Sequence, residues 1–286
     1  MDEGQFRGLG NITTIRSESV TAVIDSLGAK CLALIFSDEN QLFYDAEDIG
    51  HSGIPICFPS FGPLDDQTFV HGGKNWPMKQ HGFVRNLELP LASKTGDSVT
   101  YRLSQNEETL SRYPFNFEFA ITHQIIDAGL KIQITVSNHS DNAMPISPGI
   151  HPYFAVEDPD CVTVTTAAEF GHNNLNNYVK ERLADSEYFE VVKESDGVKT
   201  LKLFANPDQH IIDHGLETTR LTRGDQFPVN ISADPAVFKM MTVWRKHNDS
   251  AFVCVEPANF KNALNSQPLL IPPGDTLQTE ISMQFG

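Results

Sequence analysis

The sequence is dominated by a two-residue alternation of apolar and polar side chains. The alternation is regular over residues 115–122 and 130–137 and looser over residues 99–103 and 277–285. Successive side chains of a strand point to opposite faces of a sheet. Each of these segments therefore predicts a β-strand with one face on an apolar core and the other face in water.

Turn-forming residues separate the predicted strands. Gly, Pro, Asn, Asp and other small polar residues cluster at 93–97, 138–142, 195–197 and 272–275. Such regular punctuation is typical of an antiparallel meander of many strands. Helical spacing is scarce, and only residues 106–112 predict a helix of a turn or two.

We find no low-complexity linker and no repeat of fixed period that would divide the chain. Two long irregular regions, residues 45–86 and 168–184, are rich in Gly, Pro, Asn and His. Loops of that length in a compact domain are more often functional than idle. We therefore expect an all-β fold, a large antiparallel β-sandwich, that forms one domain over residues 1–286.

The charge balance narrows the range of partners. The chain has 37 acidic and 21 basic side chains and a formal net charge of -16. This balance argues against nucleic acid, whose phosphates need clustered Lys and Arg, and against anionic membrane surfaces. No apolar run reaches the ~18–20 residues of a transmembrane helix, and no apolar core of a secretory signal follows the acidic residues 1–5.

The four cysteines, Cys31, Cys57, Cys161 and Cys254, share no Cys-x-x-Cys spacing, and each lies in or beside an apolar stretch. We expect four buried thiols that pack as small hydrophobic groups, in preference to a disulfide or metal framework. Such thiols fit a reducing, cytoplasmic compartment.

Histidine is the first residue type to consider for chemistry, because it titrates near neutral pH. His123 lies in an alternating strand and is expected on its polar, exposed side, whereas His139, His210 and His247 lie among polar residues typical of surface loops. No His-x-His or His-Glu-x-x-His spacing is present, so no metal site is expected.

Three segments stand apart as candidate sites. The first runs from Gly-Ile-Pro-Ile-Cys-Phe-Pro-Ser-Phe-Gly (residues 53–62) to Gln-His-Gly-Phe-Val-Arg-Asn (80–86). The second contains His-Pro-Tyr-Phe (151–154), and in the third Glu256 ends an apolar run. A carboxylate at the end of a buried strand is costly to desolvate and is a candidate for proton transfer. A Glu256 that merely leaves the strand into solvent is the alternative, and the residues alone leave both open.

These motifs, in this order and followed by Val-Glu-Pro (255–257), resemble the aldose 1-epimerase (galactose mutarotase) superfamily. Within it the chain is most similar to the glucose-6-phosphate 1-epimerase, or hexose-6-phosphate mutarotase, branch. The resemblance extends from about residue 17 to residue 284. It implies a galactose mutarotase-like β-supersandwich that binds a pyranose in an open cleft.

The resemblance also implies roles for individual residues. His151 matches the catalytic acid of the family and Glu256 its catalytic base. His81 matches a second active-site histidine that contacts the sugar, and Arg85 falls in the same sugar-binding loop. Asp213, within Ile-Asp-His, resembles the substrate-binding aspartate.

The implied reaction suits these side chains. Interconverting two anomers requires a base for the proton of the C1 hydroxyl and an acid for the ring oxygen, and a carboxylate and an imidazole form such a pair near neutral pH. No electrons or groups are transferred, so no cofactor and no metal are expected. The implied partner is a small-molecule sugar or sugar phosphate, and we expect a monomer or a weak homodimer.

The substrate stays open at this point. In the hexose-6-phosphate branch an Arg usually precedes the Gly-Gly-Ile-Pro motif, whereas His51-Ser52 stands there in this chain. Lys74, Lys79 and Arg85 are the remaining cations that could hold a phosphate. A hexose 6-phosphate, a neutral aldohexose and another aldose are all possible substrates. His71, followed by two glycines, is an alternative to His81 as the residue that faces the sugar.

A different class of function is a carbohydrate-binding or regulatory module on the same fold, since fold does not determine function. Trp76, Tyr153 and Trp244 could stack on a sugar in either case. The presence of both His151 and Glu256 favours an enzyme, because a binding protein needs no matched acid and base. A glycosidase is disfavoured, because that chemistry generally requires two carboxylates.

Overall fold

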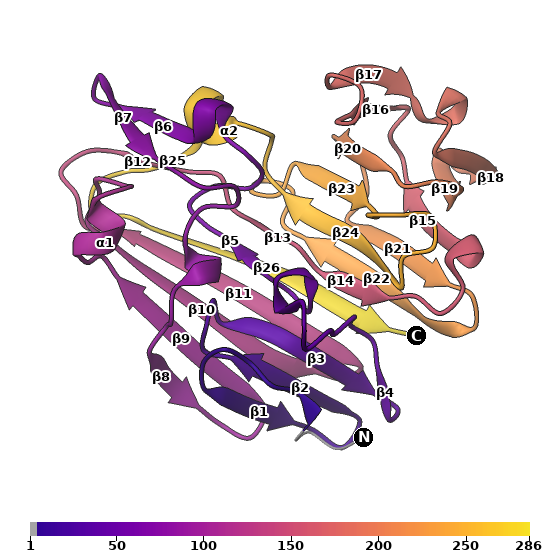
Figure 1. The fold of residues 1–286 in the computed structure, drawn as a ribbon, viewed down its shortest axis with the longest axis horizontal. Helices are drawn as coiled ribbons and strands as arrows, with labels where there is room; N and C mark the ends of the chain where they lie inside the picture. The colour runs from indigo at the N-terminus through magenta and orange to yellow at the C-terminus, as the bar shows by residue number, and fades with distance from the viewer. Residues whose placement is uncertain (1–4) are drawn as a thin grey trace.

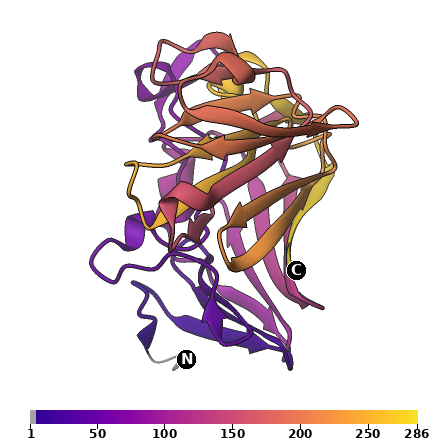
Figure 2. The same cartoon turned by 90° about the vertical axis from the view of Figure 1, so that its right-hand side faces the viewer.

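The computed structural model describes residues 5–286, which form a nearly all-β molecule (Figure 1). The largest sheet has ten strands. In spatial order they are β18 (Phe189–Ser195), β19 (Val198–Leu203), β15 (Val162–Thr166), β21 (Thr218–Arg223), β22 (Gln226–Ala233), β26 (Thr276–Phe285), β11 (Gly129–Asn138), β10 (Phe117–Ile126), β9 (Ser98–Ser104) and β8 (Leu91–Lys94). Figure 2 shows its long strands curving along one side of the molecule.

The second large sheet carries the candidate site. Its spatial order is β17 (Val179–Arg182), β16 (Phe170–Asn173), β20 (Asp208–Ile212), β23 (Met240–Trp244), β24 (Phe252–Ala258), β13 (Gly149–Ile150) and β5 (Ile56–Cys57), with β14 (Tyr153–Ala155) also paired to β24. All of these pairings are antiparallel.

Smaller sheets and short helices complete the fold. A four-stranded sheet packs on β9–β11, and two further sheets have two strands each. The four-stranded sheet consists of β1 (Ile12–Arg16), β2 (Val20–Asp25), β3 (Lys30–Phe36) and β4 (Glu39–Asn40). The two-stranded sheets are β12 (Met144–Ile146) with β25 (Leu269–Ile271), and β6 (Thr68–His71) with β7 (Lys74–Pro77). The α-helices are α1 (Glu107–Leu110) and α2 (Ala263–Ser266), and the 3₁₀ turns are η2 (Ile49–His51), η3 (Asp65–Gln67), η4 (Val84–Asn86), η5 (Pro159–Cys161) and η6 (Leu183–Asp185).

The predicted alternation is visible in the central strands. In β10 buried and half-buried residues alternate along all ten positions, and β10 pairs with β11 in unbroken antiparallel register. The all-β sandwich prediction is therefore confirmed. The expected helix at 106–112 is also present as α1, where the Asn106 side chain accepts a hydrogen bond from the backbone N–H of Thr109.

One strand prediction is wrong. His123 is fully buried, because it is in phase with Phe119 and Ile121 on the apolar face of β10 and not with the polar residues. Its Nε2 lies 2.8 Å from the carbonyl oxygen of Ala29, between β2 and β3, and this contact gives one nitrogen of the buried ring a partner.

The cysteine prediction holds for three residues of four. Cys31, Cys57 and Cys254 are buried free thiols, whereas Cys161 is exposed. Cys161 differs because it ends a surface 3₁₀ turn, where its thiol donates to Oδ2 of Asp158 at 2.9 Å.

Over residues 5–286 none of the helices has the length and apolarity that crossing a membrane requires. The acidic segment noted at the start of the chain falls mostly on residues 1–4, outside the described residues.

Candidate active site

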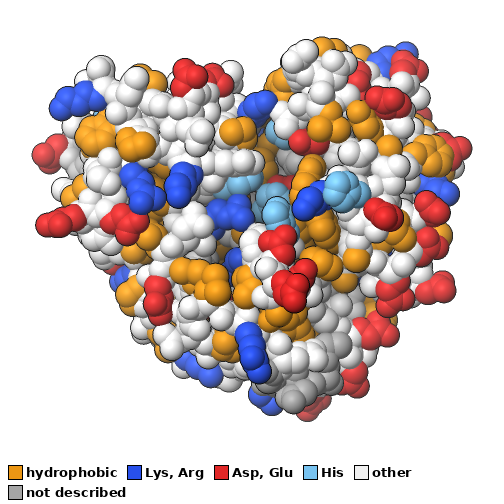
Figure 3. Space-filling model, in the orientation of Figure 1, with side chains coloured by type: hydrophobic (Ala, Val, Ile, Leu, Met, Phe, Trp, Pro, Cys, Tyr) orange, Lys and Arg blue, Asp and Glu red, His pale blue; other side chains and the backbone are white. Residues whose placement is uncertain are grey.

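A polar pocket of about 570 Å³ opens on one face of the eight-stranded sheet. Its floor comes from β24, β23 and β20, and its rim from the long loops that precede and follow residues 53–62. In Figure 3 histidine side chains and basic side chains gather in and around the hollow, although the protein is acidic overall.

Strand register places acidic and imidazole groups together on the pocket floor. Glu256 in β24 pairs with Thr242 in β23, and Thr242 pairs with His210 in β20. Directly paired residues of an antiparallel sheet point to the same face. Glu256 and His210 therefore face the same cavity from strands that lie two positions apart.

His151 and Glu256 form the centre of the pocket. His151 lies between β13 and β14, and its backbone N–H donates to the carbonyl of Pro55 at 2.9 Å. Its Nε2 lies 3.5 Å from Oε2 of Glu256. Both side chains are largely removed from water, with 10% of the His151 side chain and 2% of the Glu256 side chain exposed.

Burial controls the protonation of this pair. It lowers the pKa of His151 well below its usual value, with the neighbouring His81 and Arg85 acting in the same direction. Burial, and then the charge of Asp208, raises the pKa of Glu256 well above its usual value, while Arg85 opposes this. A neutral imidazole beside a protonated carboxyl contains as many protons as an imidazolium beside a carboxylate. Transfer of one proton across the pair thus interconverts its neutral and charged forms.

His81 lies beside this pair. Its backbone has a positive φ of 64°, and its Nδ1 accepts a hydrogen bond from the N–H of Gly62 at 3.1 Å. Its Nε2 lies 3.1 Å from Nε2 of the Gln80 side-chain amide, so both ring nitrogens have polar neighbours. Burial lowers the pKa of His81 to about 3, so this histidine is neutral at physiological pH.

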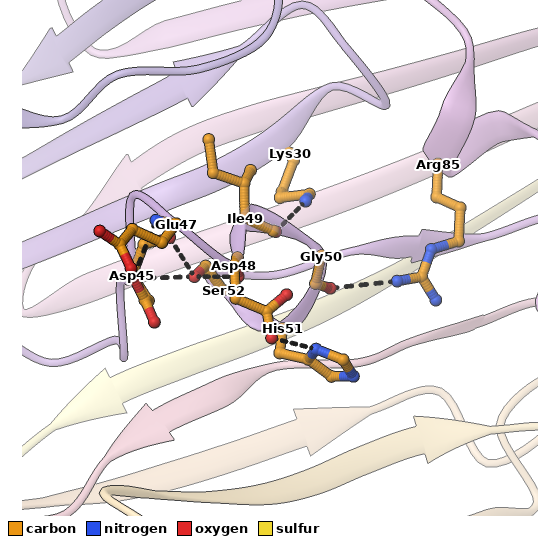
Figure 4. A network of polar contacts seen from close by, with 9 residues as sticks. All are labelled: Lys30, Asp45, Glu47, Asp48, Ile49, Gly50, His51, Ser52 and Arg85. Carbon is orange, nitrogen blue, oxygen red and sulfur yellow. Dashed lines mark hydrogen bonds and ion pairs between the residues drawn. The ribbon is translucent and has the colours of Figure 1, made fainter.

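Arg85 lies in η4 at the rim, and Figure 4 shows what holds it there. Its Nη2 donates to the carbonyl of Gly50 at 3.2 Å, while Nζ of the buried Lys30 donates to the carbonyl of Ile49 at 2.7 Å. Two basic side chains thus bind adjacent carbonyls of η2. The same turn presents His51, whose Nδ1 lies 2.7 Å from Oδ2 of Asp48 and whose side chain lines the pocket.

The opposite wall contains residues for which the motifs gave no indication. Asp208 and His210, two residues apart in β20, both line the pocket, as does Asn174 after β16. Nδ2 of Asn174 donates to Oδ2 of Asp208 at 2.8 Å, and Nε2 of His210 lies 3.5 Å from Oδ1 of Asp208. The prediction of a surface loop at His210 is wrong, because this residue is 4% exposed within a strand.

Asp213 is not brought to this pocket. It follows the other end of β20 with a φ of 51°, and it lines a separate cavity with His214 and Lys239. The aspartate among the lining residues of the pocket is Asp208, five residues earlier. A signal was present in the sequence, because Asp208 and His210 share one face of a strand if the period of two begins at Asp208.

The other candidates divide between the pocket and the surrounding structure. Tyr153 stacks on His151 with ring centroids 4.7 Å apart, and Trp244 meets the same ring edge-on at 5.6 Å. Trp76 packs against the apolar core, and its indole N–H donates to the carbonyl of His71. His71 itself stacks on Phe69 and is not part of the pocket lining.

Among residues 5–286, one group of side chains has the proximity needed for a metal ion. Donor atoms of His151, Cys254 and Glu256 all lie within 4.8 Å of one another. Metal binding requires a thiolate and a carboxylate. Burial opposes both, since it raises the pKa of Cys254 and of Glu256. Nδ1 of His151 is buried without a hydrogen-bond partner, so the outer support usual for a metal-bound histidine is missing as well.

The site can therefore move protons between two buried groups at the floor of an open, polar cavity. Donors and acceptors surround that floor: His81 and Arg85 on one side, and Asp208 with Asn174 on the other. This arrangement suits a small, hydroxyl-rich ligand that undergoes acid/base chemistry.

Comparison with known structures identifies the same architecture in other proteins. The Synechocystis sp. PCC 6803 protein Slr1438 superposes with a TM-score of 0.86 at 23% identity and covers 100% of this chain and 99% of its own. A galactose mutarotase-like protein from Lactobacillus casei superposes with a TM-score of 0.82 at 21% identity, over 96% of this chain and 100% of its own.

Two sequence relatives match parts of the chain. The chromosomal protein LacX of Lactococcus lactis is 26% identical over 147 residues, which is 49% of either chain. An Escherichia coli K12 protein provisionally named glucose-6-phosphate 1-epimerase is 26% identical over 219 residues, 72% of this chain and 66% of its own. The chain thus spans about half the length of LacX and just under two thirds of the E. coli protein.

The decisive comparison is with a whole family. The profile of the family described as aldose 1-epimerase matches residues 12–284, nearly the entire chain. The expected resemblance is confirmed, and the chain belongs to the aldose 1-epimerase family.

Proposed function

We propose that this protein is an isomerase that interconverts the α and β anomers of a hexose or a hexose 6-phosphate. The observation that carries the proposal is the 3.5 Å approach of His151 Nε2 to Glu256 Oε2 at the floor of the pocket. A sugar above this pair would meet one proton donor and one proton acceptor at once.

In the proposed reaction Glu256 accepts the proton of the C1 hydroxyl while His151 donates a proton to the ring oxygen. The C1–O5 bond breaks, and C1 becomes the aldehyde carbon of the open chain. Rotation about C1–C2 presents the other face of the aldehyde. O5 then attacks C1, His151 takes the proton back, and Glu256 returns one to O1, which restores both groups.

Three side chains are proposed to bind the sugar: His81, Arg85 and Asp208. The neutral His81 offers a polar ring, Arg85 supplies a positive charge at the rim, and Asp208 accepts from sugar hydroxyls on the opposite wall. Asp213 is not included, because it lines a different cavity.

The choice between a neutral and a phosphorylated sugar depends on the rim. Lys79, Arg85 and His51 line one side of the pocket, which favours an anionic substituent there. The provisional name of the E. coli relative points the same way. We propose further that the chain forms a single domain, because one apolar core includes residues from Ile15 to Phe285. We propose that this domain acts in the cytoplasm as a monomer or weak homodimer. Its partner would be a small sugar, and neither nucleic acid nor a membrane.

Anomer exchange tests the proposal directly. Magnetisation-transfer NMR is run on glucose, galactose and glucose 6-phosphate, with spontaneous mutarotation in buffer as the blank. The wild type should accelerate at least one sugar, and Glu256→Gln should lower that rate by about a hundredfold or more, because it removes a catalytic base. Glu194→Gln, on the exposed edge strand β18, is the matched control.

The outcomes separate the candidate functions. Acceleration confined to glucose 6-phosphate assigns the rim cations to a phosphate, and acceleration of the neutral sugars assigns the pocket to unmodified hexoses. A wild type that binds sugar without accelerating exchange would support the carbohydrate-binding module instead. Full activity in Glu256→Gln would contradict the assignment of the base.

A further inference from the structure

Lys261 lies behind the wall of the pocket that carries Asp208. It follows β24 and precedes α2, is half-buried, and does not itself line the cavity. Its Nζ donates to Oδ1 of Asn174 at 2.7 Å and lies 5.0 Å from the centre of the Tyr178 ring. A charged side chain thus contacts two residues of the segment that connects β16 to β17.

The contact with Lys261 determines which way the Asn174 amide points. An ammonium group only donates hydrogen bonds, so the amide end that meets Lys261 must be the oxygen. The amide nitrogen then faces Oδ2 of Asp208 at 2.8 Å, where a carboxylate only accepts. The reversed amide would place a donor against a donor and an acceptor against an acceptor. The backbone N–H of Asn174 adds a third contact, to the carbonyl of Asp208 at 2.9 Å.

Tyr178 supports the same wall through a costly backbone conformation. Its φ of 62° and that of Asn177, 51°, lie in the left-handed region, which a bulky aromatic residue rarely adopts. Such conformations persist where the surroundings hold them, often beside functional sites. Here the ring lies against Lys261, and its hydroxyl lies 3.2 Å from Nδ1 of His210.

The contacts of Lys261 and Asn174 affect the His151–Glu256 pair through the negative charge of Asp208. Asp208 is half-buried in the pocket and shares a sheet face with Glu256, and its negative charge raises the pKa of Glu256. The position of the Asp208 carboxylate thus affects both the sugar and the base. This carboxylate accepts a hydrogen bond from Asn174, which in turn accepts one from Lys261.

We propose that Lys261 is a positioning residue: its ammonium group orients the Asn174 amide, which holds the Asp208 carboxylate toward the sugar and toward Glu256. The inference rests on the proposed function, since it assigns Asp208 to sugar binding. It predicts that Lys261 acts on the Asp208 carboxylate through Asn174.

The test is Lys261→Met, which keeps an unbranched side chain and removes the ammonium group. KM for the accelerated sugar should rise about tenfold, the size expected for losing a hydrogen bond to a charged group, while kcat changes little. Asn174→Ala should have a comparable effect, and the double variant should be no worse than Asn174→Ala alone. Lys261→Arg should recover most of the lost affinity.

Lys180→Met is the matched control. Lys180 lies on β17 of the same hairpin, over the Phe170 ring at 4.6 Å and away from the pocket lining. Its loss removes a cation from the hairpin without touching Asn174, so KM should keep its wild-type value. An equal KM increase in Lys180→Met would show a general weakening of the hairpin and would overturn the inference.

A second readout is independent of turnover. The side-chain amide signals of Asn174 in a ¹H–¹⁵N spectrum, assigned by their loss in Asn174→Ala, should shift in Lys261→Met and stay in place in Lys180→Met. Unshifted signals in Lys261→Met would overturn the inference, as would multiplication of the two single KM effects in the double variant. An inactive wild type would contradict the proposed function, and the amide signals would still decide the role of Lys261.

Discussion

The Nε2 atom of His151 lies 3.5 Å from Oε2 of Glu256, although the two residues come from segments about a hundred positions apart in the sequence. β14, which follows His151, pairs antiparallel with β24, which contains Glu256. The pairing of Tyr153 with Cys254 fixes the register between the two segments. Strand register therefore sets the relative position of the proposed acid/base pair.

The first prediction concerns pH. Because burial lowers the pKa of His151 and raises that of Glu256, the pair carries the proton count needed for catalysis only between the two values. Below the pKa of His151 both groups are protonated, and above the pKa of Glu256 neither can donate. We expect a bell-shaped profile of kcat/KM, with its acid limb below the usual histidine value of 6.5 and its alkaline limb above the usual glutamate value of 4.5. An acid limb at or above pH 6.5, after subtraction of the buffer blank, would contradict it.

The second prediction tests Asp208 against Asp213. The negative charge of Asp208 raises the pKa of Glu256, so Asp208→Asn should lower that pKa and move the alkaline limb to lower pH. KM should rise in the same variant, because a carboxylate proposed to bind the sugar is lost. Asp213→Asn is the control at the other end of β20, and it should leave both KM and the alkaline limb in place. The opposite result would return the substrate-binding role to Asp213.

The third prediction concerns Arg85. Its positive charge lowers the pKa of both His151 and Glu256. Arg85→Met should raise both values and displace the whole bell to higher pH, in contrast to the one-sided displacement in Asp208→Asn. Arg102→Met, on the exposed side of β9, removes an equal charge far from the pocket and serves as the control. Displacement of only one limb in Arg85→Met would show that its charge does not act on both groups.

Part of this site could be predicted from the sequence because its residues lie in compact motifs. His81, Arg85, His151 and Glu256 each stand within a run of Gly, Pro and aromatic residues that fixes the local backbone, and the structure brings all four to one pocket. The strands were predictable for a similar reason, since alternation is a local property of the chain.

The remaining wall of the site depends on contacts that are remote in sequence. His210 is polar and has polar neighbours, so its local sequence resembles that of a loop. Its place in a strand follows from the pairing of β20 with β16 on one side and with β23 on the other. Lys261 joins Asn174 across 87 positions. His123 differs for another reason, because one hydrogen bond to Ala29 lets an imidazole occupy a place in the apolar face. None of these partners is visible in the local pattern.

The fourth prediction concerns the turn that carries His51. Nζ of Lys30 donates to the carbonyl of Ile49, and burial, with the charge of Arg85, lowers the pKa of Lys30 to about 8 (Figure 4). Lys30→Met would leave the Ile49 carbonyl without this donor and should reduce the free energy of unfolding by about 1–3 kcal/mol. Urea unfolding measures the change, with Lys94→Met on the exposed strand β8 as control. Equal stability of the two variants would show that the contact adds nothing to the fold.

The last prediction concerns the backbone that presents His81. Gly82 has a φ of 73°, and a Cβ at this position would lie 2.1 Å from the carbonyl oxygen of Phe58. That oxygen accepts hydrogen bonds from the N–H groups of Phe83 and Val84, so it cannot move without weakening these two bonds.

Gly82→Ala should therefore lower Tm and displace His81, with a loss of both stability and mutarotase activity. Gly72→Ala separates the two causes, because Gly72 has a similar φ of 60° and a Cβ at that position would meet no other atom within 4 Å. The Gly72 variant should show only the cost of the left-handed backbone, about 1 kcal/mol, and should keep its activity. If the two variants lost the same stability, the close approach of Gly82 to Phe58 would not be what requires glycine there.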